Sequence, residues 1–131
     1  MENNREERRS YIEVFQDKIA AFRKGPGEET LTDLFRLLYD GLLQDCALPC
    51  AAKMAEGGGF ELAYAVRADG TRSLAVLSRL DGERFPVIAD VRLRTLLSLV
   101  MEQENCDGII IDPADDDRVF IPKEDLALLL Q

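Results

Sequence analysis

The residues most able to do chemistry are the acids near the end of the chain. Asp115, Asp116 and Asp117 follow closely after Asp112, and carboxylates are the ligands that hard divalent cations prefer. The spacing lacks the alternating acids, the central glycine and the distant glutamate of a calcium-binding EF-hand loop. A hydrated loop tip is the favoured interpretation. A small-molecule- or metal-responsive site in the acidic loop 112–117 is the alternative.

Other catalytic groups are scarce. The chain contains no histidine, which removes the usual proton shuttle near neutral pH. No Gly-x-Ser-x-Gly elbow or dinucleotide fingerprint occurs, and no serine has a recognisable base beside it. The glycine triplet at 57–59 lacks the Lys-Ser/Thr pair and the helix that follow a phosphate loop, so it predicts a turn. We therefore expect a protein that is not an enzyme and that holds no cofactor.

The cysteines indicate a reducing compartment. Cys46, Cys50 and Cys106 are an odd number, and none of their spacings is the two-residue gap of a zinc knuckle or redox motif. Buried, inert thiols are the favoured interpretation, and a metal held by three thiolates is the alternative.

The charge of the chain restricts its partners. The net charge is −9, and from Met101 onward nine acids stand against Arg118 and Lys123 alone. This balance argues against nucleic acid and against anionic membrane surfaces. The acidic end is either a solubilising face or a surface for a protein partner with a basic surface. The charged N-terminus lacks the apolar core of a signal peptide, and no apolar run reaches about 18 residues. The expected location is the cytoplasm.

The acids are positioned by the stretch 106–131. The apolar run Gly108-Ile109-Ile110-Ile111 predicts an interior strand, because β-branched residues favour strands and no alternation is visible. Asp112-Pro113 ends that strand, and the acids at 115–117 form the tip of the following connection. Residues 118–121 predict a second strand. Pro122 then fits the first position of a helix over 123–131, which would bury Leu126, Leu129 and Leu130.

The N-terminal part predicts two helices. Apolar residues recur at helical spacing over residues 6–24, and Gly25-Pro26-Gly27 ends that pattern. A second pattern runs from Thr30 to Asp45, with Thr30 or Thr32 as its cap. The short break indicates a helical hairpin. The apolar stripes of these helices indicate core, with a groove for a partner as the alternative.

The middle of the chain predicts strands and one helix. Alternating apolar residues, a glycine-rich turn and an Asp69-Gly70 turn indicate a three-stranded antiparallel meander. Residues 85–88 predict a short extended segment, and the proline within it confines that segment to an edge of the sheet. Asp90 is the expected cap of a helix that runs to Glu104. The three strands of the meander are expected at 47–54, 60–68 and 71–79.

These elements predict an α+β fold. It has an antiparallel or mixed sheet of about five strands, two N-terminal helices, one middle helix and a short C-terminal helix. Residues 1–29 form an N-terminal helix and turn, and residues 30–131 form the α+β domain, with one compact domain overall.

The C-terminal pattern resembles a known family. Gly108-Ile109-Ile110-Ile111-Asp112-Pro113 is followed, after a polar gap, by Arg118-Val119-Phe120-Ile121-Pro122-Lys123-Glu124-Asp125-Leu126. This order is similar to the N-terminal domain of bacterial SseB-like proteins, and the strand end Ala75-Val76-Leu77-Ser78 also fits. The likeness covers Thr30 to Gln131. Asp112 stands where the family usually has asparagine, and Leu77 where it usually has phenylalanine, so the chain resembles a divergent, single-domain member.

The resemblance implies a cytosolic α+β domain without catalytic activity, and it transfers no functional residues. We therefore expect a binding or regulatory module that acts through protein–protein interaction, and pairing of two copies as a homodimer is left open. The expected interaction surface consists of the strand ends and the acidic tip: Asp112, Pro113, Asp115, Asp116, Asp117 and Phe120.

Overall fold

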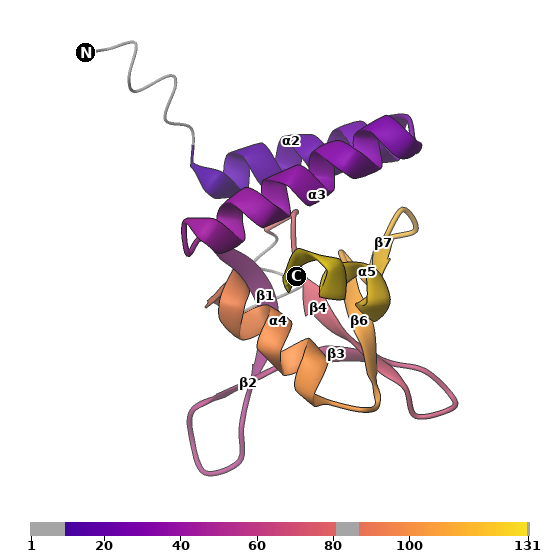
Figure 1. Cartoon of the computed structure of the whole chain (residues 1–131). Helices are drawn as coiled ribbons and strands as arrows, with labels where there is room; N and C mark the ends of the chain where they lie inside the picture. The colour runs from indigo at the N-terminus through magenta and orange to yellow at the C-terminus, as the bar shows by residue number, and fades with distance from the viewer. Residues whose placement is uncertain (1–9, 81–86, 131) are drawn as a thin grey trace, which may run out of the picture.

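Two antiparallel helices open the described part of the chain. The computed structural model describes residues 10–80 and 87–130. Helices α2 (Tyr11–Lys24) and α3 (Glu28–Leu43) pack against each other as the expected hairpin (Figure 1). Ser10 caps α2, because its hydroxyl accepts a hydrogen bond from the Glu13 N–H at 3.3 Å. The expected start of this helix at residue 6 lies outside the described residues.

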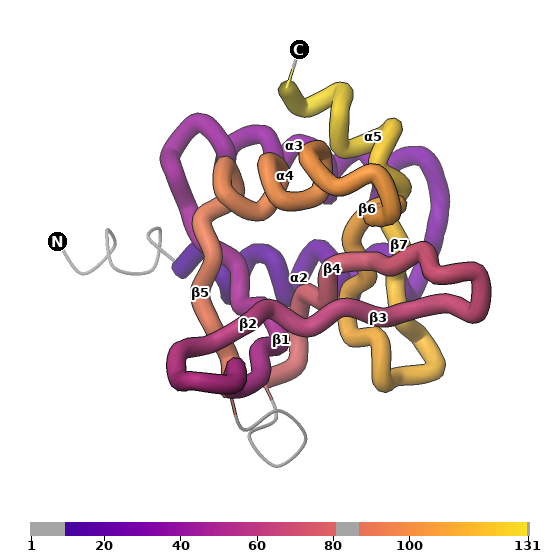
Figure 2. The backbone as a smooth tube through the Cα atoms, turned by 90° about the horizontal axis from the view of Figure 1, so that it is seen from below, coloured from indigo at the N-terminus to yellow at the C-terminus, as the bar shows by residue number. Residues whose placement is uncertain are grey.

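The described strands form one mixed sheet of seven strands. The main order is β2-β1-β4-β6-β7; β3 pairs with β4, and β5 pairs with β1. Only the β4–β6 pair is parallel among the pairs of described strands. The β2–β3 ribbon runs across from β1 to β4 (Figure 2). The strands are β1 (Ala47–Met54), β2 (Phe60–Leu62), β3 (Tyr64–Val66), β4 (Arg72–Val76), β5 (Ile88–Arg92), β6 (Cys106–Ile111) and β7 (Val119–Pro122).

The remaining helices follow β5 and β7. Helix α4 (Leu93–Glu102) connects β5 to β6, and α5 (Lys123–Ala127) continues into the 3₁₀ turn η1 (Leu128–Leu130). The expected α+β class is therefore confirmed, with two N-terminal helices, a middle helix and a short C-terminal helix around a mixed sheet. The strand expected at Gly108 to Ile111 is confirmed as the interior strand β6, which lies between β4 and β7.

The helices cover one face of the sheet. A single apolar cluster joins residues of the four described α-helices, such as Phe15 and Leu96, to one face of β1, β4, β6 and β7. The opposite face of β1 and β4 holds a smaller cluster of Ala51, Ala75 and Leu77, which contains no helix residue. The sheet therefore has a helix-covered face and a face that no described helix packs against.

The start of the middle helix was predicted wrongly. Asp90 does not cap a helix, because residues 88–92 form β5 and pair with the first half of β1. The helix begins at Leu93, and Arg92 stands at its N-cap position in an extended conformation. A local cap signal was overridden by strand pairing, which gives the backbone of β1 a partner on its outer side.

Three smaller boundaries also differ. Helix α3 begins at Glu28, and Thr30 sits inside the first turn, where its hydroxyl accepts from the Gly27 N–H at 3.1 Å. Pro122 ends β7 and takes the N-cap position of α5 instead of its first helical position. Leu126 and Leu129 are buried as expected, but Leu130 is 51% exposed because the helix tightens into a 3₁₀ turn.

Candidate interaction surface

Asp112 closes the end of β6 by bonding to the end of β4. The two strands are parallel, so their carboxyl ends meet at the same edge of the sheet. Asp112 has a φ of +55°, a left-handed conformation that aspartate tolerates better than most residues. Its Oδ1 accepts from the Ser78 N–H at 2.8 Å and from the Arg79 N–H at 3.2 Å. The carboxylate thus accepts hydrogen bonds from two backbone N–H groups that follow the end of β4.

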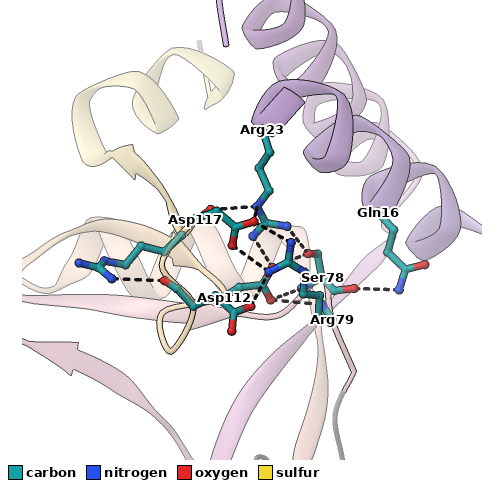
Figure 3. A network of polar contacts seen from close by, with 8 residues as sticks. Gln16, Arg23, Ser78, Arg79, Asp112 and Asp117 are labelled. Carbon is teal, nitrogen blue, oxygen red and sulfur yellow. Dashed lines mark hydrogen bonds and ion pairs between the residues drawn. The ribbon is translucent and has the colours of Figure 1, made fainter. Parts of the chain in front are cut away.

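Helix α2 supplies the positive charge for this carboxylate. Arg23 Nη2 lies 2.5 Å from Asp112 Oδ2, and Arg23 Nε donates to the backbone oxygen of Asp117 at 2.9 Å. Gln16 Nε2, two turns earlier, donates to the Ser78 oxygen at 2.8 Å. We call Gln16, Arg23, Ser78 and Asp112 the Asp112 clasp (Figure 3). It fastens the N-terminal helix to the edge where β4 and β6 end.

The acidic tip is paired within the molecule. The Arg79 guanidinium contacts Asp117 through two nitrogens, each at 2.8 Å, and contacts Asp115 at 2.7 Å. The hydrogen bond from Arg79 lowers the pKa of Asp117 to about 2, and the same bonds raise the pKa of Arg79. Two of the acids expected to face a partner therefore hold an arginine of the same chain.

The loop does not assemble a cation site. Within residues 10–80 and 87–130, no group of three or more His, Cys, Asp or Glu side chains is arranged to hold a metal ion. The carboxylates of Asp112, Asp115 and Asp117 are turned toward Arg23 and Arg79 instead. The described geometry therefore gives the metal-responsive alternative no support.

The six residues of the expected interaction surface do not lie on one common surface. Asp112 is 3% exposed and belongs to the clasp, so it is not on the surface. Asp116 and Asp117 are exposed at the tip, and the side chain of Asp115 is 14% exposed. Pro113 and Phe120 lie elsewhere, on the sheet face that no described helix covers, and the structure brings these two together in a groove.

We call this hollow the sheet-face groove. Its position follows from the alternation of β7: Val119 and Ile121 are buried in the main cluster, so Phe120 points to the opposite face. There Phe120 stands opposite Ile110 of β6 in the strand register. The groove measures about 540 Å³ and is lined by Ala65, Val66, Arg67, Ser73, Ile110, Pro113, Arg118 and Phe120.

Two arginines give the groove its charge. Arg67 forms an ion pair with Asp107, and its guanidinium carbon lies 5.1 Å from the centre of the Phe120 ring. Arg118 donates only to the backbone oxygen of Asp115, at 3.2 Å, and has no ion pair with any residue the structure describes. The groove therefore combines an aromatic ring, 39% exposed, with an arginine that has no ion pair within residues 10–80 and 87–130.

Two serine hydroxyls of this region are engaged, and two of the thiols have raised pKa values. Ser73 Oγ donates to Asp107 at 2.7 Å, and Ser78 Oγ donates to Asp112. Each of these carboxylates is also paired with an arginine. Burial raises the pKa of the Cys50 thiol to about 12, and burial followed by the charge of Asp45 raises the pKa of Cys46. These groups, as arranged, hold structure together, and none is placed as an activated nucleophile.

Sequence reasoning missed the arginines that organise this region. Arg23 is 89 residues from Asp112, and Arg79 is 38 residues from Asp117. No local sequence pattern predicts ion pairs between residues so far apart, because each arginine is equally compatible with an ordinary solvent-exposed helix or strand face. Arg118 could have been found: it precedes the alternating strand 119–121 on the side that Phe120 occupies.

Comparison with known proteins gives no assignment. No family model, no curated protein and no solved structure matches the chain. None of the helices in the described part of the chain has both the length and the apolar character needed to cross a membrane.

Proposed function

We propose that the chain is a non-catalytic, cytoplasmic protein-binding module of SseB-like type, and that it holds an extended segment of a partner protein in the sheet-face groove. The observation that carries the proposal is Arg118, which has no ion pair among the described residues, beside the exposed ring of Phe120. An acidic side chain next to an apolar one would satisfy both groups at once. The lining of the groove also includes the small residues Ala65 and Ser73, whose side chains take up little space.

The charges of the groove favour an acidic partner segment over the basic one that the tip alone would suggest. The carboxylates of Asp115 and Asp117 are occupied by Arg79, whereas Arg118 contacts a backbone oxygen and no carboxylate in the part of the chain that the structure describes. Charges already paired within the chain have less to offer a partner, because binding would first have to break the existing contacts. The overall acidity of the chain is then a source of long-range repulsion that raising the salt concentration would weaken.

The SseB-like and non-catalytic parts of the proposal rest on other observations. The residues that carry the resemblance fall on β6, β7 and the start of α5, and on the end of β4. The absence of histidine and the raised pKa of Cys50 support a role without bond-making chemistry. The cytoplasmic location is supported by three cysteines that are all free thiols.

A selection from displayed random peptides tests the proposal. The wild-type chain should enrich peptides in which Asp or Glu neighbours Phe or Leu. Arg118→Gln should weaken the selected peptides about tenfold in fluorescence anisotropy, because a hydrogen-bonded charge contact is lost. Phe120→Ser should weaken them by a similar factor through the loss of the apolar contact.

Arg36→Gln is the matched control. Arg36 is an exposed arginine of α3 without an ion pair among the described residues, and it lies outside the groove. Its replacement should leave peptide affinity unchanged. Peptides that bind Arg118→Gln as tightly as the wild type would overturn the proposal.

A further inference from the structure

A second hollow lies between α3 and the segment formed by α5 and η1, on the helix-covered side of the sheet. Figure 1 shows α5 beneath α3. Leu31 and Phe35 of α3 form one wall, and Leu128 and Leu129 form the other, with Asp125 beside them. The hollow measures about 340 Å³. We call it the helix groove. It shares no residue with the sheet-face groove, so the two can be tested separately.

The change from α5 to η1 creates the apolar rim of the helix groove. Leu126 and Leu129 pack into the core, so the tightening of the last turn directs Leu128 and Leu130 outward. Leu128 is 63% exposed and Leu130 is 51% exposed. Phe35 and Leu31 are only half-buried, although they stand on the apolar stripe of α3. Several large apolar side chains thus meet at one place on the surface, which is typical of a contact site.

The surroundings of the groove are acidic. The Asp125 carboxylate has no hydrogen bond or ion pair to any residue in the described ranges. Glu124, which precedes it in the first turn of α5, is exposed. Although only Leu31 and Phe35 of α3 line the groove, this helix carries along its whole length four acids against Arg36 as its one base: Glu28, Glu29, Asp33 and Asp40.

The acidic residues of α3 and α5 indicate which kind of partner fits the helix groove. A second copy of the chain would bring the acids of one α3 and α5 against those of the other, and like charges placed opposite each other are repelled. A segment with leucine or phenylalanine on one face and lysine or arginine around it would satisfy the apolar walls and Asp125 together. We propose that the helix groove docks a basic amphipathic helix of a partner protein.

The test uses synthetic peptides, because the partner is defined by its chemistry. The probe is a fluorescent Leu/Lys peptide of about 18 residues with leucines at helical spacing. A second peptide has the same composition in an order without that spacing. We expect the patterned peptide to bind at least about tenfold more tightly than the scrambled one in fluorescence anisotropy. In heteronuclear NMR spectra, the amide signals that shift should be those of Leu31, Phe35, Asp125 and Leu128.

Exposed variants locate the binding without threatening the fold. Leu128→Gln and Asp125→Asn should each weaken the patterned peptide several-fold. Leu43→Gln is the matched control for Leu128→Gln. Leu43 is 59% exposed and belongs to α3, the helix that forms one wall of the groove, but it does not line the groove. Arg118→Gln should also leave this affinity unchanged, whatever it does at the sheet-face groove.

Three results would overturn the inference. The first is equal binding of the patterned and scrambled peptides, which means attraction by net charge alone. The second is a set of NMR shifts centred on any other surface. The third is a dimer in sedimentation experiments that Leu128→Gln dissociates, because that result assigns the groove to a second copy of the chain.

Discussion

The carboxylate of Asp112 joins three separate parts of the chain. The carboxylate accepts a hydrogen bond from Ser78, just after β4, and forms an ion pair with Arg23 of α2. Asp112 itself directly follows the last residue of β6. Both partners of the ion pair are largely withdrawn from water, with side-chain exposures of 11% for Arg23 and 2% for Asp112. Removing one partner of such a buried ion pair strongly destabilises the folded protein, because the remaining charge then lacks compensation.

Arg23→Met should therefore destabilise the protein strongly. We expect the free energy of unfolding to fall by about 3 kcal/mol, because the buried side chain of Asp112 would lose its main partner. Urea denaturation followed by circular dichroism measures this change. Arg36→Met, an exposed arginine on the neighbouring helix, should stay within about 0.5 kcal/mol. Equal effects of the two substitutions would mean that the clasp contributes nothing specific.

Asp117 gives a pH prediction with a definite sign. Its pKa in the folded chain is lowered to about 2 by Arg79, below the ordinary aspartate value of about 4. A lowered folded-state pKa contributes stability that is fully present above about pH 4 and is lost as the pH falls toward 2. Arg79→Met should raise the pKa of Asp117 toward its ordinary value. An NMR titration of the side-chain carboxyl carbon reads this out, and an unshifted titration in the variant would contradict the pairing.

Cys50 should be inert in the folded protein. Burial raises the pKa of its thiol to about 12, so almost no thiolate exists at pH 8. We expect iodoacetamide to leave Cys50 unmodified in native protein and to alkylate it fully in urea, as read by peptide mass spectrometry. Cys46, which is partly exposed, should label before Cys50. Rapid native labelling of Cys50 would show that the strand around it opens easily.

Among the elements, β6 depends on one glycine. Gly108 has a φ of +152°, and a Cβ added there would lie 2.1 Å from the backbone oxygen of Ile121 in β7. Only glycine allows the two strands to pair at this distance. The interior strand β6 can therefore approach β7 this closely at Gly108 only because this residue has no side chain.

Gly108→Ala should cost about 3 kcal/mol or more of unfolding free energy, because both the left-handed conformation and the backbone clash oppose it. Gly70→Ala is a matched substitution at φ +89° in a turn where a Cβ meets nothing within 4 Å. It should cost only about 1 kcal/mol. Thermal and urea denaturation of both variants provide the comparison, and similar losses would place the whole effect in the backbone angle.

The same elements show which local signals suffice for prediction. Gly108 to Ile111 was recognised because β-branched residues and a following proline act locally. Residues 88–92 were assigned in part to a helix because an aspartate before apolar residues also resembles a cap. Only the partner strand β1, about forty residues earlier in the chain, decides between these alternatives. The pairing of Arg23 with Asp112 likewise depends on the finished fold.

At the scale of the whole molecule, the N-terminal helix is part of the main core. Phe15 and Ile19 of α2 are fully buried in the same cluster as Leu74, Ile109 and Leu126. Phe15→Ala should lower the free energy of unfolding by about 3–5 kcal/mol, because it leaves a cavity in that cluster. Calorimetry should show one cooperative transition at a lower temperature for the variant. Two separated transitions would instead make α2 an independently melting unit.

The position of β6 has a consequence for biosynthesis. Val76 of β4 pairs with Ile111, so the inner edge of β4 stays unpaired while the ribosome adds the intervening α4 segment. An open strand edge can pair with other chains. Nascent polypeptides halted before residue 111 should therefore aggregate rather than fold, and the β4–β6 part of the sheet should form only after β6 has been synthesised.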